Sequence, residues 1–318
     1  MYIDLNTYQE KVTGMKNYEN IKEGNEELLK LYETQPPISL SVLNSIAAWN
    51  HKCEVKGRHV PFLSIKAVPT SGFASVNLLK GYDVQLDTLS KLETKFVKGL
   101  AYYKNIVAIS TQYPLLKITE TLSIAENLGV RHPSNIVSNK RSRYEQVSVM
   151  TTDVLITFID SRKNICKEAF SLKYISEDGC YRSTQNKELN TKNKLQIEAT
   201  YWERKEVKWS EITQKHPLIN KDFQDNLSQM SVYDDVNYPK TLLKKVRRKI
   251  LLIYSKHAAF IEFHALIELV AASLKTAECK IRGCFWVLMR EHQLPFNMHR
   301  KIKPFGLLYK SEEPWLWE

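Results

Sequence analysis

A predicted β-hairpin over residues 148–175 constrains the fold of this chain more than any other feature. Two runs rich in β-branched and aromatic residues flank the turn-like segment 160–164. If the runs pair antiparallel about the middle of this turn, Asp153 lies opposite Ser171. Lys173 is then the diagonal neighbour on the same face, because side chains alternate along a strand.

This pair of opposite charges on otherwise apolar strands is costly to bury without a purpose. It suits a metal-dependent phosphodiesterase, in which the Asp153 carboxylate holds Mg²⁺ and the Lys173 ammonium offsets charge on a phosphate. The alternative is structural, either a satisfied buried aspartate or an ion pair with Lys173. Buried ion pairs are weak stabilisers once desolvation is counted, so a structural role alone explains the arrangement poorly.

Glu93 is the third candidate. It lies on the apolar stripe of a helix predicted over residues 87–103, so its carboxylate is expected to point toward the protein. The alternative is a capping box, in which Glu93 bonds back to the backbone of Ser90. The alternatives differ in where the helix begins, because capping requires a start at Ser90 and the stripe begins up to one turn earlier.

The composition is that of a soluble globular protein. The chain has 318 residues, of which 43% are hydrophobic and 25% charged. No apolar run is long enough to span a bilayer, and the first residues are not predicted to form a signal peptide, because no basic region is followed there by an apolar stretch. The five cysteines are odd in number and form no close C-x-x-C pair. We therefore expect reduced thiols in a cytoplasmic protein.

The positive charge is concentrated at the C-terminal end. Residues 240–318 contain 15 Lys and Arg against 7 Asp and Glu, so +8 of the net +11 lies there. The segment 242–252 alternates apolar residues with cations, which predicts a helix with one buried and one basic face. A polyanionic partner, most simply nucleic acid, fits this distribution. A solvated basic face and a protein-docking domain are the alternatives.

The order of predicted elements favours an α/β nuclease-like domain followed by a helix-rich domain. Three helices and a short strand at the end follow winged-helix order. We expect an N-terminal helical extension over 1–57, an endonuclease core over 58–231 and a C-terminal domain over 232–318. Besides the hairpin, the pattern predicts helices at 7–34, 41–49, 117–128, 189–204 and 217–231, and strands at 107–113 and 207–213.

Six ordered sequence blocks resemble the TnsA family, the endonuclease subunits of heteromeric cut-and-paste transposases. Singly each block is weak, but their common order makes the match specific. The blocks are V-P-F-L with V-P-T-S-G (60–72), L-S-K-L-E (89–93), Q-Y-P-L with I-A-E-N-L-G-V-R-H-P (112–133), M-T-T-D-V-L (150–155), S-L-K (171–173) and L-Q-I-E-A-T-Y-W (195–202).

The resemblance implies an α/β restriction-endonuclease-like core, with a central mixed sheet flanked by helices, plus an α-rich, winged-helix-like C-terminal domain. It implies Mg²⁺-dependent hydrolysis of one strand, at the 5′ ends, of double-stranded DNA at transposon ends. Its partners would be a transposase subunit that cuts the other strand and a regulatory ATPase subunit. Glu93, Asp153 and Lys173 fall on the family's two acids and lysine, and Glu198 falls on its helix glutamate.

The chain departs from the family at Ser171, where an amide or acid that can ligate metal is usual, and at Thr111, where glutamate is frequent. The Ser171 hydroxyl can still ligate the ion, together with Glu93 and Asp153. The departure keeps open a second function, a non-catalytic DNA-binding and scaffolding subunit. A third is a stand-alone restriction-type nuclease, which would cut DNA without a partner.

Overall fold

The computed structural model describes residues 35–65, 73–78, 85–138, 143–181, 185–257 and 260–311. The helix predicted over 7–34 lies outside these residues. The chain divides into two compact units, and each is described by itself. One comprises Met1–Phe62, Pro114–Thr152 and Tyr181–Trp209, and the other comprises Leu63–Tyr113, Asp153–Cys180 and Ser210–Glu318.

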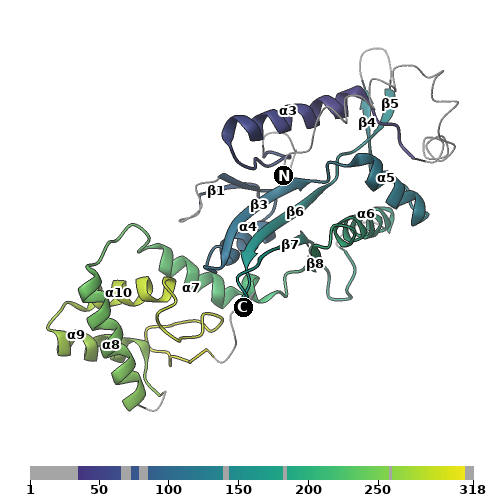
Figure 1. Ribbon diagram of the computed structural model, residues 1–318. Coiled ribbons are helices and arrows are strands. Elements are labelled where there is room, and N and C mark those ends of the chain that lie inside the picture. Colours follow the sequence, from purple (N-terminus) through teal and green to yellow (C-terminus); the bar gives the residue numbers. More distant parts are fainter. Residues whose placement is uncertain are drawn as a thin grey trace. The chain divides into compact units, whose positions relative to one another are not determined.

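A four-stranded sheet carries Asp153 and Ser171, and Lys173 directly follows one of its strands. Its strand order is β3-β6-β7-β8 (Figure 1). The antiparallel register of β6 and β7 pairs Val154 with Phe170 and Ile159 with Ile165, which confirms the predicted hairpin. The strands predicted at 107–113 and 207–213 agree with β3 and β8. The strand bounds are Ile106–Pro114 for β3, Thr151–Ile159 for β6, Ile165–Leu172 for β7 and Lys208–Ile212 for β8.

Helix α4 (Lys91–Leu100) is shorter than the helix predicted over 87–103, and that prediction was wrong at its start. The residues before α4 form strand β2 (Gln85–Thr88), which pairs with β1 (Ser75–Leu78). Ser90 is the N-cap, and its hydroxyl accepts the Glu93 backbone N–H at 3.1 Å. A side-chain acceptor of this kind starts a helix at the next residue, whereas the apolar stripe continues into the strand before it.

The first unit has its own small core, made by Val42, Ile46, Ile118, Leu122 and Val147. Helix α3 extends seven residues beyond the predicted 41–49 because its left-handed C-cap glycine comes only at residue 57. Strands β4 and β5 form an antiparallel hairpin that the sequence did not indicate, since polar residues interrupt both. The elements are α3 (Leu40–Lys56), α5 (Ile118–Asn127), β4 (Ser134–Ser138), β5 (Arg143–Val147) and α6 (Gln185–Glu203).

The C-terminal part of the second unit is helical, as expected. Helices α8, α9 and α10 pack on one another (Figure 1). Isolated antiparallel bridges join Glu262 to Leu307 and Phe296 to Lys310. The helix predicted over 217–231 is divided, because the Asn220 side chain caps a new helix. The bounds are Pro217–Ile219 for the 3₁₀ helix η2, Lys221–Ser231 for α7, Lys240–Lys256 for α8, Phe263–Leu274 for α9 and Glu278–Arg290 for α10.

One continuous hydrophobic core runs through the second unit. It includes Phe96 of α4, Val154 of β6, Phe223 of α7 and Trp286 of α10. The sheet flanked by helices agrees with the expected α/β core. A winged-helix-like C-terminal domain and the domain boundaries after residues 57 and 231 stay predictions. Among the residues that the structure describes, none of the helices combines the length and apolar character needed to cross a bilayer.

Candidate active site

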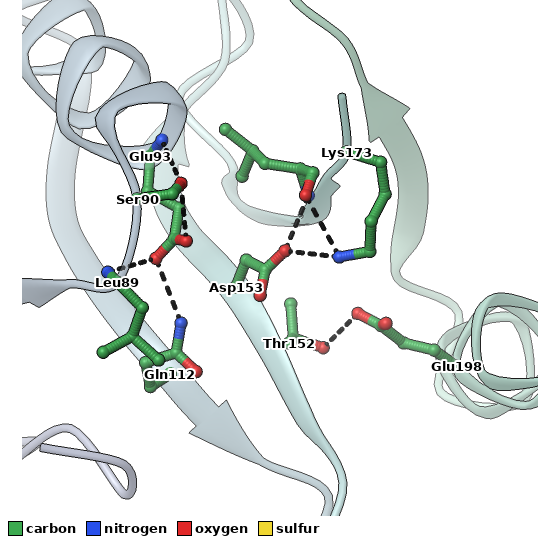
Figure 2. Close-up of polar contacts among 9 residues, drawn as sticks. Leu89, Ser90, Glu93, Gln112, Thr152, Asp153, Lys173 and Glu198 are labelled. Carbon is green, nitrogen blue, oxygen red and sulfur yellow. Dashed lines mark hydrogen bonds and ion pairs between the residues drawn. The ribbon is translucent and has the colours of Figure 1, made fainter. Parts of the chain in front are cut away.

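Asp153 and Lys173 meet across the hairpin of β6 and β7. The Lys173 ammonium donates to Asp153 Oδ2 at 3.0 Å and to the Leu172 carbonyl at 3.1 Å. The backbone N–H of Leu172 donates to the same Asp153 oxygen at 2.7 Å (Figure 2). The side chains of Lys173 and Asp153 are 29% and 16% exposed. The pair is therefore tightly held and still reachable from solvent.

Ser171 lies on β7 two residues before Lys173 and is buried. One further step along the ladder from the pair of Val154 with Phe170 places Ser171 opposite Asp153. This is the register that the sequence predicted. The role of the Ser171 hydroxyl as a metal ligand stays a prediction.

Glu93 is both a helix cap and a buried carboxylate. Its Oε1 accepts the Ser90 hydroxyl at 2.8 Å, and its Oε2 accepts the Leu89 backbone N–H at 2.9 Å. The helix starts where the capping alternative required. The side chain is nevertheless only 6% exposed, so it is not turned to solvent as an ordinary cap would be. Glu93 can therefore cap the helix and still be buried, because the Leu89 N–H and the Ser90 hydroxyl bond its carboxylate inside the protein.

The charges of Asp153 and Lys173 both act on Glu93. The pKa of Glu93 is raised to about 7, chiefly by burial and then by the nearby Asp153 carboxylate. The Leu89 and Ser90 hydrogen bonds and the Lys173 charge act in the opposite direction. A buried carboxylate whose ionisation is disfavoured by a second carboxylate nearby is an arrangement that a cation would stabilise.

Gln112 is a member of this site that its sequence position did not reveal. It lies on β3, is buried, and donates its side-chain amide to Glu93 Oε2 at 3.1 Å (Figure 2). Its sequence block belongs to the resemblance, but no spacing rule links residue 112 to residue 93. Only the approach of β3 to the start of α4 brings the two side chains together.

Glu198 belongs to the other unit and is held there by Thr152. The Thr152 hydroxyl donates to Glu198 Oε1 at 2.7 Å and accepts the indole N–H of Trp202, also at 2.7 Å. All three residues are buried. The sequence alone would make Glu198 a surface glutamate, whereas the structure gives its carboxylate a buried partner in the residue that precedes Asp153.

A second group of possible ligands lies on the C-terminal helices. His264, Glu268 and Glu278 bring one ligand atom each to within 4.8 Å of one another. The two glutamates are exposed, and His264 already forms an ion pair with Glu268, one helical turn away, at 3.2 Å. Such a pair is ordinary on a helix surface, so we assign the candidate site to the sheet.

The donors gathered at the sheet suit a hard divalent cation. Glu93, Asp153 and Ser171 offer oxygen atoms, which Mg²⁺ prefers over nitrogen or sulfur. The mutual repulsion of the two carboxylates gives a physical reason for a cation between them. The chemistry of the donor set therefore fits Mg²⁺.

Two comparisons with known proteins bear on this site. Residues 103–214 match the model of the TnsA-like endonuclease N-terminal family. This segment contains β3, β6, β7, α6 and β8, and with them Gln112, Asp153, Lys173 and Glu198. The chain is also 25% identical over 168 residues to the transposon Tn7 transposition protein TnsA of Escherichia coli.

The second match covers 52% of this chain and 55% of the relative. The chain thus spans about half the length of the curated relative that it matches.

Proposed function

We propose that this chain, which both matches support as a member of a TnsA-like family, is a DNA endonuclease subunit of a heteromeric transposase. It hydrolyses one strand, at the 5′ ends, of double-stranded DNA at transposon ends. One observation carries the proposal. The charged groups of Glu93, Asp153 and Lys173 interact with one another, and the segment that contains Asp153 and Lys173 matches an endonuclease family.

Glu93 and Asp153 would hold Mg²⁺, with the Ser171 hydroxyl as a further ligand. The two donors to Asp153 both occupy Oδ2, which leaves Oδ1 as the oxygen to offer to the ion. When bound, a divalent cation lowers the pKa of a coordinated water and polarises a phosphate oxygen. Three hydrogen-bond donors keep the Glu93 carboxylate in one orientation, so little conformational freedom is lost when it ligates.

Lys173 supplies positive charge at a fixed place. Its bonds to Asp153 and to the Leu172 carbonyl orient the ammonium beside the proposed metal ligand. An ammonium held there stabilises the negative charge that develops on the phosphate during hydrolysis. Glu198 is proposed as a further catalytic residue, with its carboxylate held by Thr152 next to Asp153 in the chain.

Helix α8 offers a surface for the DNA backbone. Its buried side is apolar, and the helix has six exposed cations and not one acidic residue. Surfaces of this kind bind phosphates without reading sequence. The exposed cations are Lys240, Lys244, Lys245, Arg247, Arg248 and Lys256.

The proposed partners are a transposase subunit that cuts the other strand and recognises the ends, and a regulatory ATPase subunit. The decisive experiment is a reconstituted cleavage reaction on a DNA end, with the partner transposase and with either Mg²⁺ or EDTA. Nicking of one strand that needs both Mg²⁺ and the partner supports the proposal. Cutting without the partner would favour a stand-alone nuclease, and assembly without cleavage would favour a scaffolding subunit.

A further inference from the structure

Gln112 adopts a backbone conformation that is unusual for its place in the fold. Its φ is +49°, although it lies inside strand β3. Of the non-glycine residues with positive φ in the described part of the chain, the other four lie in a turn or just after a helix. Those four are Lys163, Glu206, Lys275 and His292.

The left-handed region costs a residue with a β-carbon on the order of 1–2 kcal/mol. Glycine avoids this cost, and asparagine or aspartate reduces it. Glutamine has no such advantage. A glutamine at this position therefore points to a requirement for its side chain, because the backbone by itself would favour glycine.

The backbone conformation re-aims the side chain. Along β3, Thr111 and Gln112 are both buried, so the alternation of a regular strand is interrupted between them. Local irregularities of this kind can direct a side chain to the face of the sheet opposite to the one that regular alternation would give it. In this chain the amide of Gln112 is turned to the Glu93 carboxylate, 3.1 Å away.

The Gln112 bond differs from the other two bonds to Glu93. Leu89 and Ser90 belong to the turn that starts α4, so they move with Glu93. Gln112 belongs to β3, which is the neighbour of β6 in the sheet. Its amide thus ties the Glu93 carboxylate to the sheet that carries Asp153.

We propose that Gln112 is a positioning residue, whose amide holds the Glu93 carboxylate in register with Asp153 so that both can bind one divalent cation. The inference rests on the proposed function. A neutral amide suits the task because it donates to the carboxylate without neutralising it. A lysine would compete with the cation for Glu93, and an apolar residue would leave Glu93 oriented by its own helix alone.

Two substitutions test the role. Gln112→Gly removes the amide and the backbone strain, and Gln112→Met removes the amide but keeps the volume. Lys163→Gly is the matched control, because Lys163 also has positive φ, at +68°, but lies exposed in the β6–β7 turn. The measurement is the Mg²⁺ concentration that half-saturates the rise in melting temperature of the full-length protein, with Ca²⁺ as a second probe.

We expect both Gln112 variants to need at least about tenfold more Mg²⁺, the usual scale for losing a group that orients a ligand. Lys163→Gly should match the wild type. Cleavage with the partner should shift to higher Mg²⁺ in parallel and recover in part at saturating Mg²⁺. Mg²⁺ affinity equal to wild type in either folded Gln112 variant would overturn the inference and leave the proposed function intact. A wild-type protein that shows neither a Mg²⁺ response nor cleavage overturns both.

Discussion

Lys173 Nζ lies 3.0 Å from Asp153 Oδ2, and the backbone N–H of the residue before Lys173 donates to the same oxygen. One carboxylate oxygen thus holds both the ammonium and the end of strand β7. This arrangement fixes the carboxylate and the ammonium relative to each other before any substrate binds, which is the condition for electrostatic stabilisation of a transition state.

Asp153→Asn should abolish strand cleavage with little loss of stability. The substitution keeps the shape of the side chain but removes the charge that would hold the metal, so we expect a fall of at least about two orders of magnitude in rate. The measurement is nicking in the reconstituted complex. Asp160→Asn, at a half-buried aspartate that begins the turn of the same hairpin, is the control. Cleavage by the Asp153 variant at the wild-type rate would contradict the proposed metal site.

Lys173→Met should also stop cleavage but leave Mg²⁺ binding in place, because the ammonium is not a ligand. The apolar replacement retains most of the packing of the lysine side chain. Lys167→Met removes an exposed lysine from β7, the strand that Lys173 follows, and should cleave normally. If Lys173→Met lost Mg²⁺ affinity as fully as Asp153→Asn, the lysine would be a determinant of metal binding and its separate role would be refuted.

The metal-free protein should lose stability as pH rises from about 5 to 8. The pKa of Glu93 is raised to about 7 in the folded state, from its ordinary 4.5. Between these values the folded state binds a proton that the unfolded state does not, so the free energy of unfolding falls with increasing pH, by an amount on the order of 2–3 kcal/mol. Denaturant unfolding of wild type and Glu93→Gln across this range is the measurement. Because the variant lacks this titration, its stability relative to wild type should rise with pH by the same amount, and parallel curves would contradict the assignment.

Charge reversal on α8 should weaken DNA binding. The double substitution Lys244→Glu and Arg248→Glu changes two exposed cations one turn apart, and we expect at least about a tenfold loss of affinity and a shallower dependence on salt. The control carries the same change at Lys52→Glu and Lys56→Glu, one turn apart on α3. Affinity is measured with duplex DNA and the full-length protein at several salt concentrations. Equal losses in the two double variants would indicate a general charge effect and not a binding surface.

Thr152→Val should destabilise the protein by about 1–3 kcal/mol, because Glu198 and Trp202 each lose a buried hydrogen-bond partner. Thr157→Val, on the same strand β6, keeps these bonds and should change stability little. Chemical denaturation distinguishes the two variants. A neutral Thr152→Val would mean that Glu198 is satisfied without this hydroxyl.

The predicted elements that the structure confirmed have a clear pattern of apolar residues within one segment of the sequence. The hairpin of β6 and β7 was predicted with its register, because two apolar runs around one turn allow few pairings. Helix α4 was predicted too long at its start. Leu89 extends the apolar stripe backward, yet the Ser90 cap and the pairing of β2 with β1 end the helical segment there. The hairpin of β4 and β5 had no apolar alternation to reveal it.

By itself the sequence determined the hairpin of β6 and β7 with its register, the meeting of Asp153 with Lys173, and the resemblance that points to an endonuclease. These follow from periodicity along one chain and from pairing across one turn. The sequence predicted an inward-facing Glu93, but only the tertiary structure decided that its carboxylate would lie near Asp153 and that Gln112 would reach it from another strand. Contacts between elements distant in sequence depend on how the elements pack, and no spacing within a single segment encodes them.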